Sequence, residues 1–125
     1  MKGTLLIIDD EPELVKNLSD LFSDYLEEVI TAGDGKQGLE VLNQKNVDCV
    51  ICDFSMPIMD GLQVISKTRM FGNQVPFIFY TAFGNEELKN QVAEYEGTLF
   101  LDKPNIKELI DMTLIIIKNR LNLCR

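Results

Sequence analysis

The sequence contains no histidine, which excludes any mechanism that needs an imidazole of this chain as a base, a proton shuttle or a metal ligand. Its three cysteines make an odd count, and Cys49 and Cys52 are spaced like a metal-binding pair. These two fall on a predicted strand, however, where side chains three residues apart point to opposite faces. We therefore expect them to be buried thiols in a reducing cytoplasm, and we expect Cys124 to be exposed in the tail.

Basic residues are scarce as well, with 12 Lys and Arg against 20 Asp and Glu and a net charge of −8. A nucleic-acid partner bound directly by this chain is not expected, because phosphate backbones need clustered Lys and Arg. Long apolar runs are also absent: the first one follows Lys2 and stops at Asp9. It is too short for a signal peptide, and no segment reaches the length of a membrane span. We expect a cytoplasmic protein that does not contact the membrane.

The chain does have a hydrophobic content of 46% over 125 residues, enough for the core of one domain. Apolar runs alternate with segments of helical periodicity. The first, third and fourth runs are almost continuously apolar, which is typical of parallel strands covered on both faces. We predict an α/β fold with a five-stranded parallel sheet, doubly wound in the order 2-1-3-4-5, and five helices. The predicted strands cover about 4–9, 29–32, 47–53, 77–81 and 98–102, and the helices begin near residues 12, 36, 61, 85 and 106.

Polar side chains end four of these runs: Asp9 and Asp10, Asp53, Thr81 and Lys103. The carboxyl ends of parallel strands open on one edge, so the predicted order brings these groups together, with the first and third strands adjacent. Two carboxylates about 4 Å apart repel by about 4 kcal/mol at an effective dielectric near 20, which favours a bound cation. Mg²⁺, which Mn²⁺ can replace, prefers such oxygen ligands and also binds phosphate oxygens. Asp53 is the candidate nucleophile toward phosphorus.

Each of these residues has a simpler explanation when taken alone. The acids before Pro12 can cap a helix, Asp53 can open a turn, Thr81 suits a strand, and Lys103 lies in an ordinary loop dipeptide. Those explanations do not account for the regular position of acids, hydroxyl and ammonium at four strand ends. The joint pattern indicates a phosphoryl-transfer site.

Four segments closely resemble the receiver domain of two-component response regulators, and the likeness extends over essentially the whole chain. The segments are Asp9-Asp10-Glu11-Pro12, the nine residues from Asp53 to Gly61, Tyr80-Thr81-Ala82, and Lys103-Pro104. The resemblance implies a flavodoxin-like fold, a single receiver domain over residues 1–125 with no effector domain, and a regulatory switch in place of a conventional enzyme. It also implies a partner, a sensor histidine kinase or a histidine phosphotransfer protein, that supplies the phosphohistidine.

The resemblance further implies a role for each site residue. Asp53 would be the phosphoacceptor and a metal ligand, with Asp10 binding Mg²⁺ directly, Asp9 through water and Ser55 through its backbone carbonyl. Thr81 and Lys103 would hold the phosphoryl group. The bond before Pro104 is commonly cis in the family.

Two further positions bear on switching and lifetime. Phe100 would move into space that Thr81 vacates on activation, although it can equally be a simple core residue. Beside the site, Ser55 and Phe83 stand at positions that tune the lifetime of the acyl phosphate. The bulk of Phe83 predicts no unusually fast self-dephosphorylation. Gly38, where the family often has alanine, indicates close packing at a cost of about 1 kcal/mol in helix stability.

The last predicted helix carries more apolar residues than one buried face needs. Helical spacing predicts a core face and a second group pointing away from it. The core group is Ile106, Leu109, Ile110, Ile117 and Leu121, and the outer group is Met112, Ile115, Ile116 and Leu123. Scattered exposed apolar residues are normal. The sharper interpretation is a docking surface on the fourth helix, fifth strand and fifth helix, used for a homodimer or another partner.

Two other functions remain open from the sequence. An aspartyl phosphatase of the haloacid dehalogenase type also uses an aspartate nucleophile and Mg²⁺, but it needs a second aspartate where this chain has Ser55. A degenerate receiver acting as a constitutive binding module is disfavoured, because all five key positions are intact. Turnover of a small phosphomonoester would distinguish the phosphatase.

Overall fold

The computed structural model describes residues 1–82 and 84–123, in which strands and helices alternate along the chain. The strands are β1 (Thr4–Ile8), β2 (Glu28–Ala32), β3 (Cys49–Cys52), β4 (Phe77–Thr81) and β5 (Thr98–Asp102). The helices are α1 (Pro12–Ser23), α2 (Gly35–Gln44), α3 (Gly61–Met70), α4 (Glu86–Ala93) and α5 (Ile106–Leu123). All strand pairs are parallel and the order is β2-β1-β3-β4-β5, as predicted.

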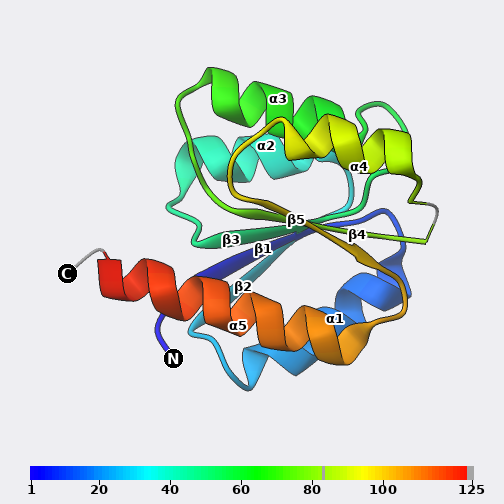
Figure 1. The fold of residues 1–125 in the computed structure, drawn as a ribbon. Helices are drawn as coiled ribbons and strands as arrows, with labels where there is room; N and C mark the ends of the chain where they lie inside the picture. The colour runs from blue at the N-terminus through cyan, green and yellow to red at the C-terminus, as the bar shows by residue number, and fades with distance from the viewer. Residues whose placement is uncertain (83, 124–125) are drawn as a thin grey trace.

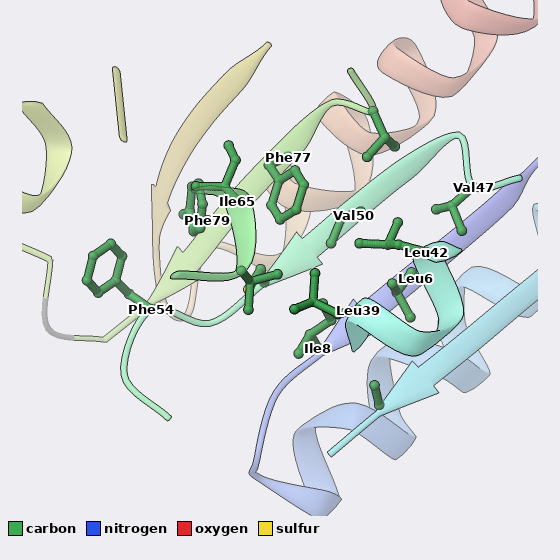
Figure 2. Packing of buried hydrophobic residues seen from close by; sticks show 14 of the residues in the cluster. Leu6, Ile8, Leu39, Leu42, Val47, Val50, Phe54, Ile65, Phe77 and Phe79 are labelled. Carbon is green, nitrogen blue, oxygen red and sulfur yellow. The ribbon is translucent and has the colours of Figure 1, made fainter. Parts of the chain in front are cut away.

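Helices cover both faces of the sheet: α2, α3 and α4 lie on one side, and α1 and α5 on the other (Figure 1). Side chains along each strand alternate between these two layers. Leu6 and Ile8 of β1 pack with α2 and α3 in the first layer, and Leu5 and Ile7 pack in the second. Figure 2 shows the first layer, in which Phe77 and Phe79 of β4 lie near Ile65 of α3. Burial on both faces explains why these strands are continuously apolar.

The two internal cysteines lie in opposite layers. Cys52 packs in the first layer and Cys49 in the second, and both are buried free thiols. The prediction that their side chains point to opposite faces of the sheet is therefore confirmed. Cys124 lies outside the described residues.

Register places the first acidic residues side by side. Ile8, the last residue of β1, pairs with Cys52, the last residue of β3. Asp9 and Asp53 each follow by one residue, and the backbone N–H of Asp53 donates to the Ile8 carbonyl at 2.9 Å. The two carboxylates therefore leave adjacent strands at the same height.

Several helices begin where the sequence places a capping residue. Pro12 opens α1, where its missing N–H costs nothing. Asp34, Asp60 and Asn85 cap α2, α3 and α4 by accepting from backbone N–H groups, and Asp60 forms a capping box with Gln63. Gly35, expected in a turn, is instead the first residue of α2. The third strand is shorter than predicted, since it begins at Cys49 and not at residue 47.

The predicted faces of α5 were partly wrong. Leu109 and Ile117 are fully buried and Ile115 is half exposed, as expected. Met112 and Ile116, however, pack against the second layer, because the fully buried Thr113 lies at the centre of the inner face. The prediction counted only apolar residues as core positions, so it did not include the polar Thr113 and misplaced the inner face.

The first residue of α5 also departs from prediction. Ile106 is exposed, because helical side chains point toward the N-terminus and this one projects past the start of the helix. The side chain of Leu123 lies outside the described set. None of the described helices combines the length and apolar character needed to cross a bilayer.

Gly38 packs directly against β1. A Cβ at this position would lie 2.9 Å from Cγ1 of Ile8 and closer still to its Cδ1. Ile8 is itself fully buried. The close packing predicted for Gly38 is confirmed, because a side chain here would occupy the volume that Ile8 fills.

We expect Gly38→Ala to lower the free energy of unfolding by about 1 kcal/mol. Overpacking a core costs about 1–3 kcal/mol, and better helix propensity returns only about 1 kcal/mol. Urea denaturation followed by circular dichroism would measure the change. The double variant with Ile8→Val removes the clashing methyl and should lose less than the sum of the single variants. A Gly38→Ala protein more stable than the wild type would contradict this.

Candidate functional site

The residues predicted from the sequence converge on a cleft of about 250 Å³ at the carboxyl ends of the strands. The residues lining it are Asp10, Glu11, Asp53, Ser55, Thr81, Ala82 and Lys103. Asp9 lies beside this lining and is buried. Four separate segments of the chain, at the ends of β1, β3, β4 and β5, therefore contribute to one site, as the predicted strand order requires.

Three carboxylates form the acidic part of the site. Asp9, Asp10 and Asp53 each offer an oxygen, and these oxygens all lie within 4.8 Å of one another. Asp9 and Asp53 are only 4% and 6% exposed, whereas Asp10 is exposed. Oxygen donors open to water on one side match the preference of Mg²⁺, which keeps several water ligands. The residues present therefore fit a magnesium ion.

The position of Asp53 is set by hydrogen bonds to its neighbours. Its Oδ1 accepts from the backbone N–H of Phe54 at 2.7 Å, and its Oδ2 lies 3.5 Å from the ammonium of Lys103. Gly61 at the start of α3 lies so close that a Cβ would be 2.7 Å from the Asp53 carbonyl oxygen. Glycine here lets the start of α3 approach the segment after β3 that carries Asp53.

Asp9 is held from two directions. Its Oδ1 accepts from the backbone N–H of Glu11 at 3.0 Å, and its Oδ2 accepts from Lys103 at 2.9 Å. Burial raises the pKa of Asp9 above its usual value, although the two hydrogen bonds oppose that shift. The folded protein therefore favours the neutral form of Asp9 more than the unfolded chain does.

Lys103 connects the carboxylates. It follows β5, donates its backbone N–H to the Thr81 carbonyl at 2.9 Å, and precedes Pro104 through a cis bond, as the family resemblance implied. Its side chain is only 11% exposed, and its Nζ lies 3.0 Å from Glu11 as well as near Asp9 and Asp53. Burial lowers the pKa of this ammonium, but the hydrogen bonds to Asp9 and Glu11 outweigh it and raise the pKa above its ordinary value.

Glu11 is the site residue that the sequence reasoning did not assign. It was expected only to cap α1, yet its side chain makes no cap hydrogen bond and contacts Lys103 instead. The ammonium of Lys103 lies closer to Asp9 and Glu11 than to Asp53. The position of Glu11 directly before Pro12 was the available signal, because such a residue is held extended.

Thr81 and Phe100 lie on neighbouring strands. Thr81 is buried at the end of β4, and the exposed Ala82 follows it into the cleft. Phe100 is half-buried beside the first core layer, with the ammonium of Lys89 5.5 Å from its ring centroid. Phe83, predicted to influence the phosphoryl lifetime, lies outside the described residues.

The fold and this site agree with a known family. The sequence model of the response regulator receiver domain matches residues 5–114. The chain therefore belongs to the receiver domain family, whose members are regulatory switches of two-component systems and not conventional enzymes. The receiver interpretation drawn from the sequence is confirmed.

Individual relatives differ in how much of their length the chain spans. It is 32% identical over 121 residues to the sensor histidine kinase RcsC of Escherichia coli, covering 97% of this chain but 13% of that protein. It is 33% identical to a probable chemotaxis protein CheY of Rhizobium etli, covering 82% of each. Response regulator TrrA of Thermotoga maritima, solved in complex with Mg²⁺ and BeF, has a TM-score of 0.77 at 25% identity, covering 91% and 98% of the two chains.

We expect the stability of the metal-free protein to carry a pH dependence from Asp9. Because its folded pKa is raised above 3.8, the folded state holds a proton that the unfolded chain has lost, so this contribution to stability falls as pH rises through that window. Asp9→Asn cannot ionise, so its stability relative to the wild type should increase as the pH rises above the ordinary aspartate pKa near 3.8.

Urea denaturation in EDTA at several pH values would measure this difference. Asp20→Asn, which removes one negative charge from an exposed position on α1, serves as the control. A constant stability difference between Asp9→Asn and the wild type across the window would contradict the expectation.

Proposed function

We propose that this domain accepts a phosphoryl group on Asp53 from the phosphohistidine of a sensor histidine kinase or a histidine phosphotransfer protein. The observation that carries the proposal is the placement of a lysine ammonium and three carboxylates around one cleft. Residues 1–125 contain no histidine, so the donor imidazole lies outside them. The relatives that combine receiver domains with kinase or regulator segments support this class of partner.

The transfer is a displacement at phosphorus. A carboxylate oxygen of Asp53 forms a bond to phosphorus while the P–N bond to the donor imidazole breaks, and the imidazole nitrogen retains the electron pair and takes up a proton from solvent. The hydrogen bond from Phe54 fixes the orientation of the attacking carboxylate. The product is an acyl phosphate on Asp53 and a neutral histidine on the donor.

Two cationic or polar groups stabilise the transferred group. Lys103 neutralises charge on a phosphoryl oxygen, and the Thr81 hydroxyl donates to another. The small side chain of Ala82 leaves room at the cleft for these oxygens. Both strand-end residues are fixed by the β4–β5 pair, since Lys103 donates its backbone N–H to the Thr81 carbonyl.

Mg²⁺ completes the proposed site. Asp10 and Asp53 would bind it directly, Asp9 through water, and Ser55 through its backbone carbonyl. When bound, the ion offsets the negative charge that gathers on the phosphoryl oxygens. The close spacing of the three carboxylates and the magnesium complex of the similar TrrA domain support this assignment.

The output surface is proposed to include α4, β5 and α5. The strand β5 lies at the edge of the sheet and pairs with β4 alone. Leu99 and Phe100 on this strand are half-buried, and Ile115 on α5 is half exposed. Movement of Thr81 toward a phosphoryl group would let Phe100 shift inward, which would change this surface for a homodimer or another partner.

Acetyl phosphate with Mg²⁺ should place a phosphoryl group on Asp53. The adduct is expected to be stable in acid and labile to base and hydroxylamine, because it is a mixed anhydride of a carboxylic acid. Intact-protein and peptide mass spectrometry would detect and locate it. Asp53→Asn and the wild type in EDTA serve as controls, and an adduct that survives in either one would disprove the assignment.

Beryllofluoride with Mg²⁺ should shift the protein toward a dimer if the α4-β5-α5 surface self-associates. The phosphoryl mimic would stabilise the active arrangement and thereby favour the pairing surface. Size-exclusion chromatography with light scattering would report the mass, and Ile115→Ser should weaken the shift. A mass that remains monomeric at every concentration would exclude the homodimer. The α4-β5-α5 surface would then bind a different protein.

A further inference from the structure

The ammonium of Lys103 has more carboxylate partners than the proposed reaction requires. Asp9 lies at 2.9 Å, Glu11 at 3.0 Å and Asp53 at 3.5 Å. An ammonium has three donors, so these three acceptors can occupy all of them. The phosphoacceptor is the most distant of the three. In this arrangement the two shorter contacts of Lys103 are to Asp9 and Glu11, and not to the proposed phosphoacceptor Asp53.

The backbone fixes Glu11 in this position. It precedes Pro12 and is extended, with φ of −94° and ψ of 101°. Its N–H donates to Asp9, so the same residue orients one partner of Lys103 through its backbone and contacts Lys103 through its side chain. Its carboxylate makes no cap bond to α1, although helix N-terminal positions favour short acidic caps. The longer side chain is therefore used for the contact with Lys103.

Glu11 also differs from the other two partners in exposure. Its side chain is 60% exposed, whereas the side chains of Asp9 and Asp53 are buried. A partner in contact with water is the one that Lys103 can leave most easily, because solvent replaces the lost hydrogen bond. The Glu11 carboxylate thus occupies a donor of Lys103 that a phosphoryl oxygen would later need.

We infer that Glu11 is a positioning residue that occupies a donor of Lys103 in the resting domain, in competition with the incoming phosphoryl group, and thereby slows phosphorylation. The inference rests on the proposed function and assigns a regulatory role within the same site. An interaction present in the resting state and broken in the transition state raises the barrier. Removing it should increase the rate of phosphoryl transfer, in contrast to the loss expected when a catalytic group is removed.

The test compares phosphorylation rates of Glu11→Gln, Glu11→Asp and the wild type with acetyl phosphate and Mg²⁺. Aspartate keeps the charge but is too short to reach Lys103. Both variants should react faster by about 1.5- to 5-fold, the range that corresponds to a partly exposed ion pair. Glu13→Gln removes the same charge from an exposed position in the first turn of α1 and should react at the wild-type rate.

A second readout does not depend on reaction. The ¹⁵N signal of the Lys103 ammonium, measured by NMR without Mg²⁺ or phosphodonor, should shift in both Glu11 variants and stay unchanged in Glu13→Gln. A merely structural role for Glu11 would not produce this pattern, because aspartate at a helix N-cap is expected to stabilise α1.

These experiments distinguish a failure of the proposed phosphorylation of Asp53 from a failure of the role assigned to Glu11. Absence of an Asp53 adduct in the wild type would overturn the proposed function itself. A normal wild-type adduct with unchanged or slower Glu11 variants would overturn only the role of Glu11. Faster Glu11→Gln with wild-type behaviour in Glu11→Asp would assign the effect to charge repulsion alone and would also overturn the positioning role.

Discussion

Repulsion among carboxylates at the edge of the sheet is the constraint on which the site depends. Two of them, Asp9 and Asp53, are buried, and burial makes their mutual repulsion harder to screen. Lys103 offsets part of it and is itself kept protonated by the acids around it. The charges of the site therefore depend on one another: the buried carboxylates need the Lys103 ammonium, and the ammonium needs the carboxylates. A divalent cation is the natural complement to the excess negative charge.

The parallel sheet makes this concentration of charge tolerable. Its apolar layers carry the stability of the domain, so the carboxyl edge can hold groups that oppose folding. Glycines bring the helices close enough to support it, as Gly38 does against β1 and Gly61 against the chain beside Asp53. The same close approaches that pack the core thus position the acids, and stability and chemistry are divided between the middle of the sheet and its edge.

Much of this arrangement follows from the sequence because the signals are local. Apolar runs fixed the strands, Pro12 and Asp60 marked helix starts, and the residue types at strand ends predicted the cleft. Features that depend on neighbours distant in the sequence were not predicted. Asp9 and Asp10 are the same residue type at adjacent positions, yet in the fold Asp9 is buried and Asp10 is exposed. Likewise, the contact between Glu11 and Lys103 joins residues 92 positions apart, which no periodicity reveals.

The register of β1 and β3 limits which insertions and deletions these two strands can accept without moving the acids. Asp9 and Asp53 face each other because each stands one step beyond the paired residues Ile8 and Cys52. Inserting or deleting a single amino acid within either strand would move its acid by about 3.3 Å and turn it toward the opposite layer. Every side chain of the candidate site would still be present in the altered chain, but the acids would no longer converge. The geometry of the proposed site therefore depends on strand length as well as on the acidic residues themselves.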